Sequence, residues 1–291
     1  MTPVSLQDGR LSEADKERYW RDGFLHPIRV LSDEAAAEAR ARIEAVERDW
    51  LEADLPHPLN TYKRVNAHVT MPFVVELARN PAILDVVEGI LGPDILIYAA
   101  EFFTKEPHSK HVVTMHQDLT YWGLGAIDGM VTAWVALSPA TRASGCMDFV
   151  RASHKNPILP HEDTFDDNNL LSRGQEIAVD IAEEDKTAIE LAPGEMSLHH
   201  GLTIHGSGPN TSDDRRIGCV IRYIRPDMAQ EVGAKDYVMS ARGEDRHRNF
   251  EHIDPPEALF SPASLAAFEQ IRAEQAKTMM KGAAKKNEMY N

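Results

Sequence analysis

Between residues 93 and 225 the chain is built from short runs of β-branched and aromatic residues separated by turn residues. The runs include DILIYAAEFFTK, HVVTMHQD, MVTAWVAL and RIGCVIRYI, and such runs predict strands. The intervals between them leave no room for repeated crossover helices, so an antiparallel sandwich or barrel is favoured over a parallel doubly wound sheet. We therefore expect a mainly β core.

Helical sequence flanks this core on both sides. Residues 32–53 are rich in Ala, Glu and Arg, contain no Gly or Pro, and begin with acidic residues that suit the helix dipole. Shorter helices are predicted over 12–20, 71–79 and 81–91, and the tail from residue 262 also has helical character. No repeat or linker marks a boundary. We expect one domain over 1–291, with a helical part to about residue 92, a β core over about 93–225 and a C-terminal segment over about 226–291.

The charge balance limits the kinds of molecule that this chain is expected to bind. The formal net charge is −15, and 43% of the residues are hydrophobic, as in a soluble globular protein. No basic stripe interleaved with aromatic residues is present, so nucleic acid and anionic membranes are poor partners for this chain. The charged N-terminus and the lack of a long apolar run favour the cytoplasm. Oligomeric state is not fixed by the sequence.

The segment MHQDLTYW carries the first chemical signal. His116 and Asp118 are two residues apart on a predicted strand, which places both side chains on one face. One imidazole and one carboxylate make two-thirds of the facial set that holds non-haem Fe(II) with open positions. A third ligand is expected elsewhere in the chain.

Three histidines in the segment SLHHGLTIHGSGPN are candidates for that ligand: His199, His200 and His205. The context favours His205, because small residues follow it and leave open space. Arg216, which opens an apolar strand further on, offers a planar fork for a carboxylate. His199 and His200 are better explained as residues at the end of a strand, one of them buried and hydrogen-bonded.

Together these segments resemble the phytanoyl-CoA dioxygenase family of Fe(II)/2-oxoglutarate oxygenases. The resemblance rests on HQD at 116–118, AW at 133–134, GCMDFVRASHK at 145–155, HGSGPN at 205–210, and Arg216 followed by Tyr223. It implies a double-stranded β-helix core of the jelly-roll or cupin-like type, with flanking α-helices and with the iron at the mouth of the barrel.

The resemblance also implies the ligand set. His116, Asp118 and His205 are expected to bind Fe(II), and no other catalytic residue is implied. The remaining positions on the iron take 2-oxoglutarate and O2. Because related halogenases lack the carboxylate ligand, the presence of Asp118 favours hydroxylation over halogenation.

For the cosubstrate, the resemblance implies that Arg216 pairs with the distal carboxylate of 2-oxoglutarate, helped by Ser207, and that Trp134 lies nearby. Arg215 is the alternative anchor. Since adjacent residues on a strand face opposite sides, only one of the two arginines can enter the barrel, and the spacing favours Arg216.

The substrate is less constrained. A small polar metabolite is expected, because no concentrated basic patch suits the phosphates of CoA. Parts of the chain, such as YWGL and NNLLSRGQEI, resemble a bacterial subgroup that includes hydroxylases of small aminophosphonates, so an aminoalkylphosphonate, an amino acid or a betaine-like compound is favoured. The candidate contacts are Lys105, Thr120, Tyr121, Trp122, Asn169, Arg173 and Arg222.

Two other classes remain open at this point. A non-catalytic metal-binding β-barrel sensor has the same fold, and a zinc-type hydrolase uses a similar ligand set, because ligand type alone does not fix the metal. An arginine that anchors a carboxylate favours the oxygenase, since a hydrolase has no use for it.

Overall fold

The computed structural model describes residues 4–125, 128–164, 166, 168–171, 174–179, 181–233 and 236–279. Its strands are β1 (Leu6–Gln7), β2 (Arg10–Leu11), β3 (Phe24–Arg29), β4 (Ile95–Lys105), β5 (Val113–His116), β6 (Met130–Ala136), β7 (Met147–Val150), β8 (His161–Asp163), β9 (Gln175–Ile177), β10 (Lys186–Ile189), β11 (Glu195–His200), β12 (His205–Ser207), β13 (Arg216–Ile224), β14 (Tyr237–Arg242) and β15 (Glu251–His252). Its helices are α1 (Glu13–Asp22), α2 (Asp33–Trp50), α3 (Leu59–Arg64), α4 (Ala67–Thr70), α5 (Pro72–Ala78), α6 (Pro81–Leu91), α7 (Leu119–Trp122) and α8 (Pro262–Met279), with short 3₁₀ turns at Ser153–Lys155 and Glu183–Asp185.

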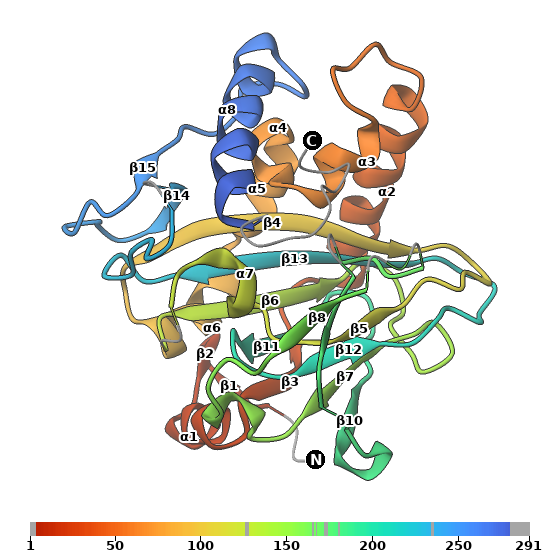
Figure 1. Cartoon of the computed structure of the whole chain (residues 1–291), viewed down its shortest axis with the longest axis vertical. Helices are drawn as coiled ribbons and strands as arrows, with labels where there is room; N and C mark the ends of the chain where they lie inside the picture. Colours follow the sequence, from red (N-terminus) through yellow and green to blue (C-terminus); the bar gives the residue numbers. More distant parts are fainter. Residues whose placement is uncertain are drawn as a thin grey trace.

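Two sheets form the centre of the molecule. The large sheet has the strand order β15-β14-β4-β13-β6-β11-β3, and the small sheet has the order β10-β7-β12-β5. Neighbouring strands are antiparallel except for the β14–β15 pair. The small sheet lies on one side of the large sheet, and helices α2 to α5 and α8 lie on the other (Figure 1). The predicted double-stranded β-helix core with flanking helices is confirmed.

The central strand β13 shows how the sequence produces this layering. All nine of its residues are buried, and alternate side chains serve different layers. Cys219, Ile221 and Tyr223 belong to the apolar core shared with the helices. Arg216 and Arg222 face the other way, into a pocket between the two sheets. One side of the large sheet therefore supplies the hydrophobic core, and the other supplies polar side chains to the pocket.

The predicted helices are present: α6 has the predicted bounds, α8 begins at residue 262 as predicted, and the ends of α1, α2 and α5 are shifted by one to three residues. The hydroxyl of Ser32 caps α2 by accepting a hydrogen bond from the backbone N–H of Ala35 at 3.2 Å. Strand β3 was not expected, because Gly23 and Pro27 indicated a break. Gly23 ends α1 in the left-handed conformation, and Pro27 is tolerated because β3 is an edge strand of the large sheet.

No helix within the described ranges is sufficiently long and apolar to span a membrane.

Candidate metal centre and cosubstrate pocket

A pocket opens between the two sheets. Polar groups from β5, β6, β11, β12 and β13 converge in it, and apolar side chains complete the wall. The lining residues are Phe103, Val113, His116, Asp118, Thr132, Trp134, Met147, His199, His205, Gly206, Ser207, Arg216, Val220 and Arg222.

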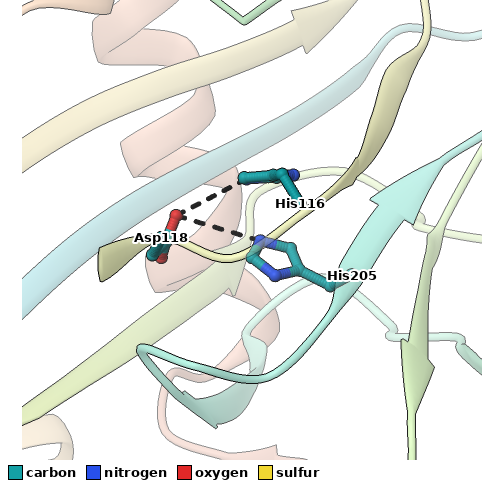
Figure 2. Close-up of side chains that lie close together, drawn as sticks. All are labelled: His116, Asp118 and His205. Carbon is teal, nitrogen blue, oxygen red and sulfur yellow. Dashed lines mark ion pairs between the residues drawn. The ribbon is translucent and has the colours of Figure 1, made fainter. Parts of the chain in front are cut away.

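Two histidines and one aspartate form a compact donor set in this pocket. The Nε2 atoms of His116 and His205 lie 3.6 Å and 4.0 Å from Asp118 Oδ1, and the three side chains point toward one another (Figure 2). One donor atom from each lies within 4.8 Å of the others. The register explains the pairing of the imidazoles, because His205 of β12 lies directly opposite His116 of β5.

The backbone at Asp118 differs from the prediction. Strand β5 ends at His116, and Asp118 has helical backbone angles at the start of α7. The strand ends there because its neighbour β12 begins at His205, the partner of His116 in the register. Turning of the chain into α7, rather than strand alternation, brings the carboxylate beside the imidazole.

Hydrogen bonds fix the tautomers of both imidazoles. His116 Nδ1 lies 2.9 Å from the carbonyl oxygen of Thr114, and His205 Nδ1 lies 2.9 Å from that of Thr203. A carbonyl oxygen only accepts, so each Nδ1 carries the hydrogen and each Nε2 keeps its lone pair. This arrangement is typical of metal-binding histidines.

The electrostatics of the donor set also suit a cation. Burial opposes ionisation of Asp118, but the Arg222 guanidinium and the nearby imidazoles outweigh burial and hold its pKa well below the usual value. Burial and the neighbouring imidazoles of His116 and His199 lower the pKa of His205 well below its usual value. An ionised carboxylate and a neutral imidazole are the forms that bind a metal.

A second group of polar side chains lies at the end of β4, β12 and β13. Arg216 and Lys105 are buried, with 1% and 0% exposure, and they face each other across the β4–β13 register. Arg216 Nη1 donates to the carbonyl oxygen of Gly145 at 2.6 Å. Lys105 Nζ donates to Ser207 Oγ at 2.7 Å and to the carbonyl oxygen of Gly208.

Neither of these two basic side chains forms an ion pair with a carboxylate of the described residues, and Arg216 Nε has no hydrogen-bond partner among them. Burial lowers the pKa of Arg216 to about 10. Burial, and the nearby charge of Arg216, lower the pKa of Lys105 to about 6. Buried cations without a counter-charge are costly, so this end of the pocket suits an anionic ligand.

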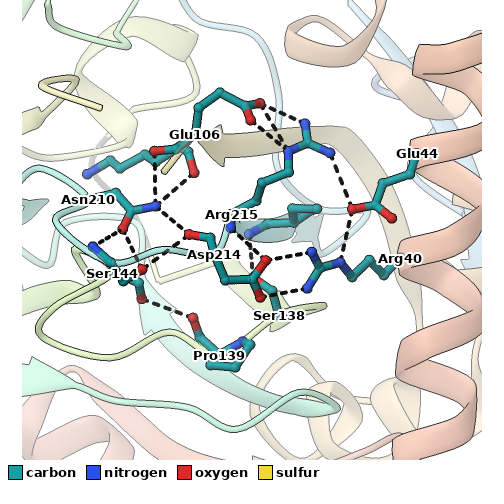
Figure 3. A network of polar contacts seen from close by, with 12 residues as sticks. Arg40, Glu44, Glu106, Ser138, Pro139, Ser144, Asn210, Asp214 and Arg215 are labelled. Atoms are coloured by element: carbon teal, nitrogen blue, oxygen red, sulfur yellow. Dashed lines mark hydrogen bonds and ion pairs between the residues drawn. The ribbon is translucent and has the colours of Figure 1, made fainter. Parts of the chain in front are cut away.

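The side chains of Trp134 and Arg215 point in the directions expected from alternation along their strands. The Trp134 ring lines the pocket, with its centroid 5.3 Å from the Arg216 guanidinium carbon. Arg215 points away from the pocket and pairs with Glu106 and Glu47 at 2.8 Å each. Figure 3 shows Arg215 in a polar network with Glu106 and Glu44.

The residues predicted to contact substrate are scattered. Trp122 packs against Tyr98 and lies 5.0 Å below Arg222, while Thr120 Oγ1 lies 3.5 Å from His161 Nε2. Asn169 donates to Thr114 Oγ1 at 2.6 Å. Only Arg222 of the predicted set is among the lining residues. Arg173 and the side chain of Tyr121 lie outside the described part of the chain.

Arg222 is already paired inside the protein. Its Nη1 donates to Glu101 Oε1 at 2.8 Å, and its Nη2 lies 3.2 Å from Asp118 Oδ1. Lys105, also predicted to contact substrate, lies instead with Ser207 and Arg216. The strand pairing places it there, since Lys105 and Arg216 are opposite residues in the register.

Sequence reasoning missed the part that Glu101 plays in this site and explained His199 as a strand-end residue. His199 lies in the pocket, is 1% exposed, and has its Nε2 atom 3.5 Å from Asp118 Oδ2. Period-2 alternation in β11 separates His199 from His200 and sends them to opposite faces. This alternation can be read from the sequence. Which of the two histidines faces the pocket depends on the pairing of β11 with β6.

Comparison with known proteins identifies a family that this chain matches. The sequence profile described as phytanoyl-CoA dioxygenase (PhyH) matches residues 19–218. The solved structure of ThoJ, described as a non-heme monooxygenase in its apo form, is 32% identical with a TM-score of 0.82, covering 91% of this chain and 97% of that one.

Two curated relatives with named activities are also similar to this chain. A probable alpha-ketoglutarate-dependent hypophosphite dioxygenase of Stutzerimonas stutzeri is 29% identical over 59% of this chain and 60% of its own length. L-proline trans-4-hydroxylase of Streptomyces griseoviridis is 28% identical over 72% of this chain and 85% of its own. The match to this chain covers only 43% to 60% of the length of several curated relatives.

Proposed function

This chain belongs to the phytanoyl-CoA dioxygenase family, and we propose that it is an Fe(II)- and 2-oxoglutarate-dependent dioxygenase that hydroxylates an unactivated C–H bond. One observation carries the proposal. The pocket that holds His116, Asp118 and His205 is also lined by Arg216, a buried cation without a carboxylate partner among the described residues. Metal donors and an anion site in one pocket match a reaction that binds a metal and a dicarboxylate together.

The donor set fits Fe(II). Two imidazole Nε2 atoms and Asp118 Oδ1 are directed at one point, and three protein donors leave further positions for cosubstrate and O2. Bound iron, 2-oxoglutarate and dioxygen supply the oxidising chemistry, with succinate and carbon dioxide as products from the cosubstrate. The protein provides the ligands, their orientation and a mostly buried set of donor side chains.

The anion end fits the distal carboxylate of 2-oxoglutarate. Arg216 provides a planar fork, and Ser207 and Lys105 add a hydroxyl and an amine on the same side. Trp134 forms the wall next to Arg216. We assign Arg216, Ser207, Trp134 and Lys105 to cosubstrate binding.

The names of two relatives favour a small substrate. The relatives named for hypophosphite and L-proline act on small polar molecules. A small polar metabolite, such as an aminoalkylphosphonate, an amino acid or a betaine-like compound, is therefore the proposed substrate class.

The test needs no knowledge of the substrate. The protein is stripped of metal and reconstituted with Fe(II) without oxygen, and 2-oxoglutarate is then added while the weak visible charge-transfer band of the chelated cosubstrate is followed. We expect the band in the wild type and a much higher cosubstrate requirement in Arg216→Ala.

Candidate substrates are then screened by succinate release. A folded, metal-loaded protein without the band would overturn the oxygenase proposal and favour a metal-binding sensor or a hydrolase.

A further inference from the structure

Three polar residues of the pocket have no part in holding the metal or the cosubstrate: Thr132, His199 and Arg222. They come from β6, β11 and β13, three neighbouring strands of the large sheet. Each of them contacts the carboxylate of Asp118. This convergence on one metal donor is what the inference rests on.

The two oxygens of Asp118 have different surroundings. Oδ2 accepts a hydrogen bond from Thr132 Oγ1 at 2.8 Å and lies 3.5 Å from His199 Nε2. Thr132 and His199 are opposite residues in the β6–β11 register, so one rung of the sheet presents both groups to the same oxygen. Oδ1 is the oxygen that faces His116 and His205.

A buried ion pair supports the carboxylate from the side of Oδ1. Arg222 Nη2 lies 3.2 Å from Oδ1, while Arg222 Nη1 donates to Glu101 Oε1 at 2.8 Å. Glu101 and Arg222 are both nearly buried, with 7% and 5% exposure. The indole of Trp122 lies 5.0 Å from the guanidinium carbon and restricts it further. Glu101 thus fixes the guanidinium that fixes Asp118.

We infer that Thr132, His199 and the Glu101–Arg222 pair are positioning residues that make Asp118 present one oxygen, Oδ1, to the metal. Because Oδ2 accepts a hydrogen bond from Thr132 and lies beside the His199 ring, the carboxylate cannot turn this oxygen toward His116 and His205 without losing the Thr132 bond. The consequence is a fixed number of protein donors, which keeps the remaining metal positions open. The inference rests on the proposed function for its purpose, but it concerns the metal site alone.

Co(II) is the probe, because its visible absorption weakens as its number of ligands rises. Metal-free wild-type protein and variants are titrated with Co(II) in the absence of oxygen. Thr132→Val removes the hydroxyl at nearly constant shape, and Thr132→Ser restores it. Thr104→Val is the matched control, since Thr104 lies on β4 and its hydroxyl has no hydrogen-bond partner among the described residues.

The ion pair is tested in the same way. Glu101→Gln keeps the shape of the side chain and removes the charge that holds Arg222. Glu106→Gln is its control, because Glu106 follows the same strand and pairs with Arg215 outside the pocket. The urea midpoint of each metal-free variant shows whether the fold is intact.

Loss of a group that holds a metal ligand in place typically weakens metal binding by about 10- to 100-fold. We expect that loss of Co(II) affinity in Thr132→Val and Glu101→Gln. In Thr132→Val we also expect weaker Co(II) absorption at saturation, because Asp118 Oδ2 then binds the metal as well. Thr132→Ser, Thr104→Val and Glu106→Gln should match the wild type. Folded Thr132→Val and Glu101→Gln proteins with wild-type Co(II) affinity and spectrum would overturn the inference.

The proposed function and the positioning role of Thr132 and Glu101 can be overturned separately. If the wild type binds Co(II) but its spectrum does not respond to 2-oxoglutarate, the proposed function is overturned, and the Thr132→Val comparison still decides the positioning role. If 2-oxoglutarate perturbs the spectrum and Thr132→Val and Glu101→Gln behave as wild type, only the positioning role is overturned.

Discussion

The amine of Lys105 donates a hydrogen bond to the hydroxyl of Ser207 at 2.7 Å, and this bond joins the last residue of β4 to the last residue of β12. It links the large sheet to the small sheet beside Arg216, at the end of the pocket away from Asp118. Lys105 is fully buried and has no carboxylate partner among the described residues. A carboxylate ligand at this point would favour the charged ammonium form of Lys105, which gives the cosubstrate site a testable dependence on pH.

Binding of 2-oxoglutarate should weaken as the pH rises. Burial and the nearby Arg216 lower the pKa of Lys105 to about 6 in the free protein, so the amine is mainly neutral above that pH. A bound carboxylate favours the ammonium form and raises the pKa in the complex. The complex therefore takes up a proton above about pH 6, and the dissociation constant should increase with pH in that range.

Calorimetry of the metal-loaded protein at about pH 6.5 and about pH 8.5, in buffers of different ionisation enthalpy, measures both the affinity and the proton uptake. Lys105→Met is the control, because it should bind 2-oxoglutarate less tightly and with a smaller dependence on pH. A wild-type affinity that is equal at both pH values and accompanied by no proton uptake would contradict this assignment of Lys105.

Arg216 and Arg215 form a matched pair for the anchoring role. Removing one partner of a buried charge pair typically costs about 2–5 kcal/mol, so Arg216→Gln should weaken 2-oxoglutarate binding by at least about 30-fold. Arg215→Gln should leave the affinity near wild type, since Arg215 pairs with Glu106 and Glu47 outside the pocket. Titration of the charge-transfer band measures both constants. Equal losses in the two variants would refute a specific anchor.

The sequence predicted much of the site because its signals are local. The short strands, the flanking helices, the H-x-D spacing of His116 and Asp118 and the open context of His205 all lie within segments of a few residues. The positions of Lys105 and Glu101 could not be predicted in this way. Each depends on the pairing of β4 with β13, strands separated by more than a hundred residues, and a shift of one residue would turn both side chains outward.

The metal should stabilise the fold through the three donors. A ligand that binds only the native state raises stability with its concentration, by about 2.7 kcal/mol at a hundred times the dissociation constant. Mn(II), which is not oxidised in air, should therefore raise the melting temperature of the wild type and have little effect on His205→Ala. Differential scanning fluorimetry with and without Mn(II) measures the shift. His247→Ala, at an exposed position, is the control, and a full shift in His205→Ala would remove His205 from the ligand set.

Close packing at Gly218 connects the core of the large sheet to the cosubstrate wall. A Cβ atom at Gly218 would lie 1.9 Å from Trp134 Cζ2, so any side chain there must displace the indole. Overpacking of this kind typically costs about 1–3 kcal/mol. Gly218→Ala should lose that amount in urea unfolding.

The same substitution should also affect binding, because the displaced indole is the wall beside Arg216. We expect weaker 2-oxoglutarate binding in Gly218→Ala and none of these effects in Gly208→Ala, where a Cβ atom meets no other atom within 4 Å. The chain has four tryptophans, so a fluorescence change in Gly218→Ala that is lost when Trp134 is also replaced by Phe reports the movement of Trp134. A stable Gly218→Ala protein with unchanged fluorescence and cosubstrate affinity would show that the added methyl group does not disturb the indole, and it would contradict the predicted coupling of Gly218 to the cosubstrate site through Trp134.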